Sequence, residues 1–175
     1  MILSVGNLIK EKNHEVVIKA MKNLNSNLLI IGKGSNYQNL MKLIKNNNLE
    51  NKISMLESVP HKDISRYYKS ADVFALAYNT ELEGLPIPVM EAMATGLPVV
   101  IPHPKEGFSD GLENSVIFSE RNSNEFHNNI KKILENQNIS QELSIKCINK
   151  SKDFDNEIIE KREAEIYKEL TNTKS

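Results

Sequence analysis

The sequence has few of the features that mark disulfide-rich, membrane-spanning or nucleic-acid-binding proteins. Its 175 residues include one cysteine and no tryptophan. A single cysteine excludes an intrachain disulfide framework and a cysteine-based metal cluster, and it fits a reducing cytoplasm. Cys147 lies in an amphipathic pattern, so we interpret it as a small core residue and not as a nucleophile.

Neither sign of charge predominates, and no long apolar run is present. Lysine and arginine total 22 against 23 acidic residues, which gives a formal net charge of -1. Such a chain has no overall field that attracts nucleic acid or an anionic membrane, so a bound anion needs a local site. No run approaches the ~18 apolar residues of a membrane span, and the first residues lack a signal-peptide pattern. We expect a cytoplasmic protein with no nucleic-acid partner and at most a peripheral contact with the inner face of the membrane.

Short apolar runs alternate with longer segments of helical period. The runs that fit strands are residues 2–6, 27–34, 52–56, 72–77, 97–102 and 115–118. Continuous valine, isoleucine and leucine runs that each lead into a helix are typical of a parallel sheet covered on both faces. Beyond residue 122 only helical patterns follow, and the last of them is highly charged. We expect one α/β domain over residues 1–175: a Rossmann-like, doubly wound, mostly parallel six-stranded sheet with helices on both faces and a helical C-terminal end.

The loops after the first two strands are candidates for ligand binding, because ligands of such sheets bind at the carboxyl ends of strands. In the first loop, Gly6 allows close approach of a ligand and Lys12 is placed to reach a phosphate. The alternative is that Gly6 makes a turn, Asn13 caps the next helix and Lys12 is solvated. The second loop, IIGKGSNYQNL, lacks the full dinucleotide fingerprint and the P-loop ending. We favour a tight turn there over a backbone contact to a ligand near Gly32.

The stretch ELEGLPIPVMEAMATGLPVV carries two glutamates with seven residues between them. Pro86 and Pro88 suit the first turn of a helix, which places Glu83 in a loop and Glu91 inside the helix. At ~1.5 Å rise per residue the carboxylates are on the order of 10 Å apart, too far to share a proton or a small metal ion. One carboxylate suits a ribose diol, and the helix start suits a phosphate. The stretch therefore predicts a site for an extended sugar-diphosphate-nucleoside; the alternative is a solvated Glu91.

Other patterns are weaker candidates. The Asp-Phe-Asp sequence at 153–155 has the spacing of a metal motif, but it lies between two late helices, where Asp155 is more simply a cap. The four histidines lie far apart, without metal-ligand spacing. His103 follows a strand and is a candidate for lining a cleft, although a turn residue is the favoured interpretation. We expect no metal and no cofactor.

Four stretches together resemble a known family: VGNLIKEKN, LLIIGKGSNYQNL, DISRYYKSADVFALA and EGLPIPVMEAMATGLPVV. They are similar to the C-terminal, nucleotide-sugar-binding domain of the retaining glycosyltransferases of family 4, which have the two-domain B-type fold. The similarity covers roughly residues 2–170, and residues 83–100 are its most specific part. It implies metal-independent transfer of a sugar, with retention, from a nucleotide-diphosphate donor to a glycan or lipid-linked acceptor, as in polysaccharide biosynthesis.

The resemblance also implies roles for individual residues. Glu83 would face the transferred sugar and the reaction centre, and Lys12 would neutralise the diphosphate leaving group, so these two are the expected catalytic residues. Glu91 would bind the ribose hydroxyls, and Leu56 and Val59 would flank the base. The full set of expected substrate-binding residues is Gly6, Asn7, Gly32, Leu56, Val59, Gly84, Leu85, Pro86 and Glu91.

Two departures from the family pattern concern the donor site. Asn7 stands where the family usually has an arginine that holds the diphosphate, and the cations in reach to replace it are Lys10, Lys33 and Lys105. The loop HPKEGFSDGLENS usually carries a Gly-Gly pair and a glutamate at the donor sugar. Here Gly107 alone clearly matches, with Glu106 and Asp110 nearby, so sugar specificity does not carry over.

Members of the family carry an acceptor-binding domain before this one, and the chain begins where that domain would end. We therefore expect it to bind a nucleotide sugar but to transfer sugar weakly or not at all alone. The alternative is a non-catalytic nucleotide-sugar-binding module, or a subunit that needs a separate acceptor-domain chain. A nucleotide-cofactor oxidoreductase is a third hypothesis, which the missing glycine fingerprint disfavours.

Overall fold

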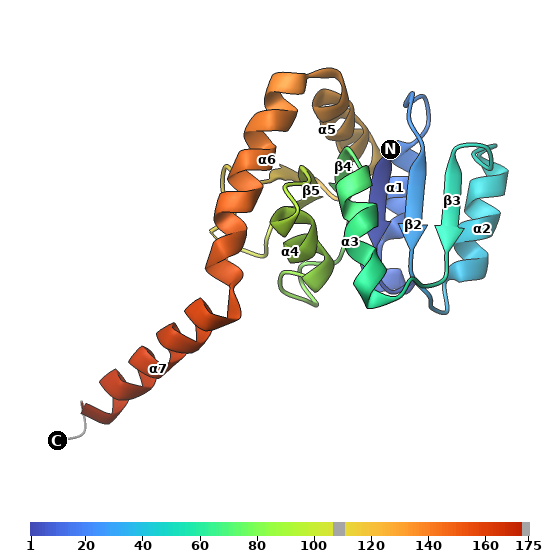
Figure 1. Ribbon diagram of the computed structural model, residues 1–175. Helices are drawn as coiled ribbons and strands as arrows, with labels where there is room; N and C mark the ends of the chain where they lie inside the picture. The colour runs from blue at the N-terminus through green and yellow to red at the C-terminus, as the bar shows by residue number, and fades with distance from the viewer. Residues whose placement is uncertain (107–110, 173–175) are drawn as a thin grey trace.

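The computed structural model describes residues 1–106 and 111–172, and its strands form a single parallel sheet (Figure 1). The strands are β1 (Ile2–Val5), β2 (Leu28–Ile31), β3 (Ile53–Leu56), β4 (Val73–Ala75), β5 (Val99–Pro102) and β6 (Ile117–Ser119). Their order in the sheet is β3-β2-β1-β4-β5-β6, and every pair is parallel. The strand order therefore reverses between β1 and β4, which is the switch point at which doubly wound sheets bind ligands.

Each of the strands β1 to β4 is followed by a helix, no helix is described between β5 and β6, and further helices follow β6 to the C-terminal end. They are α1 (His14–Ala20), α2 (Tyr37–Asn46), α3 (His61–Ser70), α4 (Ile87–Ala94), α5 (Ser123–Glu135), α6 (Gln137–Ser151) and α7 (Asn156–Asn172), with the short 3-10 helices η1 (Lys10–Lys12) and η2 (Lys152–Phe154). The expected fold class is confirmed, and the element boundaries differ from the expected ones by a few residues.

Both faces of the sheet are buried, which explains why its strands read as continuous apolar runs. Consecutive strand residues point to opposite faces: Ile2 belongs to one core cluster and Leu3 to the other. The first cluster contains apolar residues of α1, α2 and α5, including Phe126. The second contains residues of α3 and α4, including Tyr68, together with Cys147 of α6. The helices thus cover the two faces as separate layers.

Cys147 is fully buried, and its thiol donates to the backbone oxygen of Ser115 over 3.1 Å. Burial raises the pKa of this thiol to about 12, so it stays protonated near neutral pH. The interpretation of Cys147 as a core residue is confirmed. Asp155 also acts as expected, since its Oδ1 accepts from the backbone N–H of Glu157 at the start of α7.

Helix α7 projects away from the sheet (Figure 1). Its side chains Ile159, Ile166 and Tyr167 are exposed. No helix within the described part of the chain is long and apolar enough to cross a membrane.

The loops after β1 and β2 are joined through their backbones. The N–H of Gly6 donates to the oxygen of Ile31 over 3.0 Å, and the N–H of Leu8 donates to the oxygen of Lys33 over 2.9 Å. A Cβ atom on Gly32 would overlap the carbonyl of Gly6. A residue with a side chain does not fit there without a shift of the backbone. Gly32 is therefore required by the contact between the two loops.

We predict that Gly32→Ala lowers the free energy of unfolding by about 1–3 kcal/mol, because the added methyl group forces the two loops apart. The matched control is Gly84→Ala, since a Cβ atom there meets no atom within 4 Å. That control should change stability by less than about 0.5 kcal/mol. Denaturant unfolding measures both variants, and equal effects of the two substitutions would contradict the prediction.

Candidate functional site

A cavity of about 660 Å³ lies at the carboxyl ends of β1, β2 and β3, beside the start of α4. All the residues expected at the site except Leu56 line it. These are Gly6, Asn7, Lys12, Gly32, Val59, Glu83, Gly84, Leu85, Pro86 and Glu91. Leu56 is the last residue of β3, and its carbonyl accepts from the N–H of Gly32 over 2.9 Å. The next residues, Glu57 and Ser58, line the cavity in its place.

Lys12 and Glu83 form an ion pair in the wall of this cavity. The ammonium of Lys12 donates to Oε2 of Glu83 over 2.6 Å, and the two side chains are 12% and 30% exposed. Lys12 comes from η1 after β1, and Glu83 comes from the loop before α4. The other oxygen of Glu83, Oε1, is buried without a hydrogen-bond partner among the described residues. Buried polar atoms usually have such a partner, so this oxygen has an acceptor position that the described residues do not fill.

Glu91 lies within α4, as expected, and Pro86 and Pro88 stand at the start of that helix. Its Oε2 accepts a hydrogen bond of 2.8 Å from the hydroxyl of Tyr68 in α3. Burial, and in second place the carboxylate of Glu91, raises the pKa of Tyr68, so the phenol remains a neutral donor. Sequence reasoning missed Tyr68. The available signal was its position four residues after Ile64 on the same helix face; Ile64 lines the cavity and Tyr68 does not.

His14 lies directly behind the first loop. Its ring is 1% exposed, and Nδ1 lies 3.1 Å from the hydroxyl oxygen of Ser4 in β1. A Cβ atom on Gly6 would lie 3.7 Å from Nε2, so the ring packs against the backbone of the loop. Burial is the main reason why the pKa of His14 is lowered to about 4. The imidazole is therefore neutral near pH 7 and supports the loop from beneath.

The alternative interpretation expected Asn13 to cap α1. Asn13 stands at the N-cap position, but its side chain makes no capping hydrogen bond. It adopts the left-handed conformation, with φ of 48°, which asparagine tolerates better than most residues. This turn lets the chain pass from η1, which carries Lys12, into α1.

The three lysines considered as replacements for the family's arginine lie in different places. Lys33 lines the main cavity beside Gly32. Lys10 does not line it. Lys105 lines a smaller neighbouring cavity of about 270 Å³, and its Nζ lies 3.3 Å from Oε2 of Glu81. The smaller cavity shares Glu83 and Gly84 with the main one, so the two meet at the loop before α4.

The remaining candidates lie away from the main cavity or outside the described residues. His103 stacks on Phe118, with ring centroids 5.5 Å apart, and does not line the main cavity. Glu106 is exposed, and Gly107 and Asp110 lie outside the described residues. Among residues 1–106 and 111–172, no three His, Cys, Asp or Glu side chains are grouped to hold a metal ion.

The model of a protein family described as "Glycosyl transferases group 1" matches residues 1–154. An "Uncharacterized glycosyltransferase" of Haemophilus influenzae is 32% identical over 161 residues, which cover 87% of this chain and 44% of the relative. A Campylobacter jejuni protein named "N-acetylgalactosamine-N,N'-diacetylbacillosaminyl-diphospho-undecaprenol 4-alpha-N-acetylgalactosaminyltransferase" is 32% identical over 162 residues, 88% of this chain and 42% of the relative. The chain spans less than half the length of these relatives.

Solved structures share the fold at lower identity. A sucrose-phosphate synthase from Thermosynechococcus elongatus has a TM-score of 0.84 at 21% identity, over 98% of this chain and 46% of that one. An Anabaena protein solved in complex with UDP has a TM-score of 0.82 at 21% identity, over 96% of this chain and 48% of the Anabaena chain. The C-terminal domain of a group 1 glycosyl transferase from Francisella tularensis has a TM-score of 0.72 at 16% identity, over 85% of this chain and 83% of that domain.

We predict that acid destabilises the protein through His14. Because its pKa falls from 6.5 to about 4 on folding, the unfolded chain binds the proton more tightly. The stabilisation is fully present above pH 6.5 and is lost as the pH falls towards 4, by about 3 kcal/mol for this group. Urea unfolding between pH 4 and 7 should show that the stability advantage of the wild type over His14→Gln shrinks as the pH falls. Parallel pH profiles would contradict the prediction.

Proposed function

The chain belongs to the group 1 glycosyl transferases, those of family 4, and from this premise we propose that its cavity binds a nucleotide-diphosphate sugar. In this proposal the domain supplies the donor half of a retaining glycosyl transfer to a glycan or lipid-linked acceptor. One observation carries it: Glu83 and Glu91, together with Lys12, line a single cavity at the carboxyl ends of the strands.

The two glutamates have different surroundings, and this supports different roles. Glu91 accepts from a neutral tyrosine and lies beside the apolar side chains Ile64 and Ile87, which suits it to the ribose hydroxyls. Glu83 pairs with a lysine and lines both cavities, and its second oxygen is buried without a hydrogen-bond partner among the described residues. We assign that oxygen to a hydroxyl of the transferred sugar, because a sugar hydroxyl supplies the missing donor.

Lys12 is assigned to the diphosphate. An ammonium group has three N–H donors, so Lys12 can retain its bond to Glu83 while it donates to a phosphate oxygen. As the bond between the sugar and the diphosphate breaks, negative charge grows on the phosphate oxygen. A fixed cation at that position stabilises the transition state more than the bound donor. The Glu83 carboxylate in turn holds the lysine in place.

Lys33 is assigned as the second cation, the one that compensates for Asn7. Of the three lysines considered, Lys33 alone lines the main cavity. Its carbonyl is bonded to the N–H of Leu8, which ties its backbone to the first loop. Lys12 and Lys33 would then flank the diphosphate from neighbouring loops. Asn7 is uncharged and cannot serve as the second cation.

A second candidate function is a non-catalytic nucleotide-sugar-binding module, or a subunit that works with a separate acceptor-binding chain. Asn7, which stands where the family usually has an arginine, favours it. Both candidates require the same donor site. Binding experiments on the chain therefore test the part of the proposal that they share.

We predict that the chain binds one of the diphosphates UDP, GDP and ADP in calorimetric titrations, and that NAD binds more weakly. UDP is the first choice, because the Anabaena structure of the same fold contains it. Glu91→Ala should weaken that binding by about 10-fold or more, since hydrogen bonds to a charged group contribute about 1.5–3 kcal/mol.

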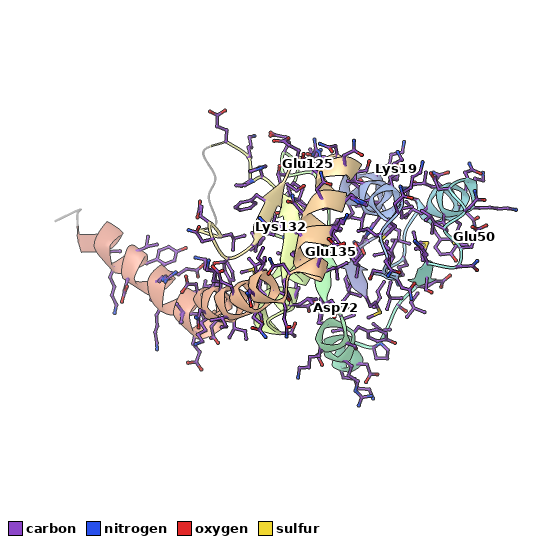
Figure 2. The ribbon with its side chains drawn as sticks, turned by 90° about the horizontal axis from the view of Figure 1, so that it is seen from above. Lys19, Glu50, Asp72, Glu125, Lys132 and Glu135 are labelled. Atoms are coloured by element: carbon purple, nitrogen blue, oxygen red, sulfur yellow. The ribbon has the colours of Figure 1, made fainter. Side chains whose placement is uncertain are left out.

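The matched control for this variant is Glu50→Ala. Glu50 is exposed and precedes β3, so it lies at the opposite end of the strand from the cavity; Figure 2 shows it at the outer edge beside α2. Binding of NAD alone, or equal effects of the two substitutions, would refute the proposed site.

We also predict that Lys33→Ala weakens nucleoside-diphosphate binding by about 5- to 10-fold, because a charge-assisted contact to phosphate is lost. Lys10→Ala should change the affinity less than about 2-fold, and the effect of Lys33→Ala should shrink at high salt. The measurement is the same titration at two ionic strengths. If Lys10→Ala has the larger effect, the assignment of the second cation is wrong.

A further inference from the structure

We infer that Tyr68 is a positioning residue: its hydroxyl orients Glu91 and thereby makes the site selective for a ribonucleotide over a 2'-deoxyribonucleotide. The inference rests on the proposed function, in which Glu91 receives the ribose hydroxyls. It adds a residue that does not line the cavity itself.

The contact joins two helices that both contribute residues to the cavity wall. Tyr68 lies in α3 and donates to Oε2 of Glu91 in α4 over 2.8 Å. The segment that leads into α3 and the first turn of this helix contribute Val59 and Ile64 to the wall, and α4 contributes Glu91. The bond therefore connects the side assigned to the base with the side assigned to the ribose.

The surrounding core holds the phenol in one place. Tyr68 is 1% exposed and belongs to the second core cluster, where its ring lies 6.1 Å from that of Phe74. A tyrosine packed in this way has little freedom to turn its hydroxyl elsewhere. The group also remains protonated at physiological pH because burial raises its pKa. Glu91 thus meets a fixed and permanent donor.

The geometry divides the carboxylate between two tasks. A carboxylate has two oxygens with about four acceptor positions. Tyr68 occupies one position on Oε2, so the remaining positions are left for a ligand. Two adjacent hydroxyls need a carboxylate in a defined plane, and the bond to Tyr68 fixes that plane before the ligand arrives. The conformational entropy of the Glu91 side chain is then lost on folding and does not weaken ligand binding.

A purely structural role for Tyr68 makes a different prediction. If only its ring mattered, Tyr68→Phe would retain the packing in the core and leave nucleotide selectivity unchanged. If the hydroxyl positions Glu91, the same substitution releases the carboxylate and acts on the hydroxyl-dependent part of binding. Selectivity between a ribose and a 2'-deoxyribose ligand therefore separates the two roles, whereas stability alone does not.

The test is calorimetric titration of the whole chain with UDP and with 2'-deoxy-UDP, which carry the same base and phosphates. The wild type should prefer UDP by about 10-fold, the value of one good hydrogen bond to a charged group. In Tyr68→Phe the preference should fall to about 2-fold, through weaker binding of UDP and nearly unchanged binding of the deoxynucleotide. Tyr67→Phe, the neighbouring half-buried tyrosine, is the matched control and should keep the wild-type preference.

A double-mutant cycle adds an independent measurement. In a Glu91→Ala background, Tyr68→Phe should change UDP affinity by less than about 2-fold, because the group that it positions is gone. Thermal unfolding of each variant confirms that it is folded. Unchanged selectivity in Tyr68→Phe, or an equal loss for both ligands, would overturn the inference. Failure of the wild type to bind any nucleoside diphosphate, or to distinguish UDP from its deoxy form, would instead overturn the proposed function.

Discussion

Parallel strands all run in one direction, so the chain must cross back to their amino ends after each strand, and helices make that return after β1, β2, β3 and β4. Every strand therefore ends at one edge, where the loops meet. Lys12, Gly32, Val59 and Glu83 are far apart in the sequence and still line one cavity, because each follows the carboxyl end of a different strand. Without this constraint, the ion pair between Lys12 and Glu83 could not form across 71 positions of the chain.

Within this frame, backbone contacts set the geometry of the site more than side chains do. The glycines of the second loop allow it to lie directly against the first, and His14 fills the space beneath. Two lysines thus come from loops that support each other. The cavity wall carries two lysines, Lys12 and Lys33, and three glutamates, Glu57, Glu83 and Glu91. An anionic ligand therefore depends on the placement of these two lysines and not on an excess of positive charge, either at the site or in the whole chain.

The sequence was sufficient to predict the sheet, the helices and most of the cavity wall. Continuous apolar runs predict strands, and the two prolines before Glu91 predict the start of a helix. Both patterns depend only on residues that are neighbours in the sequence. The contacts of Tyr68 and His14 could not be predicted, because each joins segments whose relative position depends on the complete fold. The sequence offered three lysines as the second cation, Lys10, Lys33 and Lys105. The packing of the two loops is needed to show that only Lys33 of these three lines the main cavity. Leu56 does not line the cavity, because the strand continues to that residue and the loop begins after it.

Glu83 and Gly84 belong to the walls of both cavities. A ligand that turns the Glu83 side chain on one side must change the shape and charge presented on the other side. Thermodynamic linkage then requires the effect to be reciprocal: the free energy by which one occupant favours or disfavours the other is the same in both directions. A single loop carboxylate is in this way sufficient to make two neighbouring cavities respond to each other, with no movement of the domain as a whole.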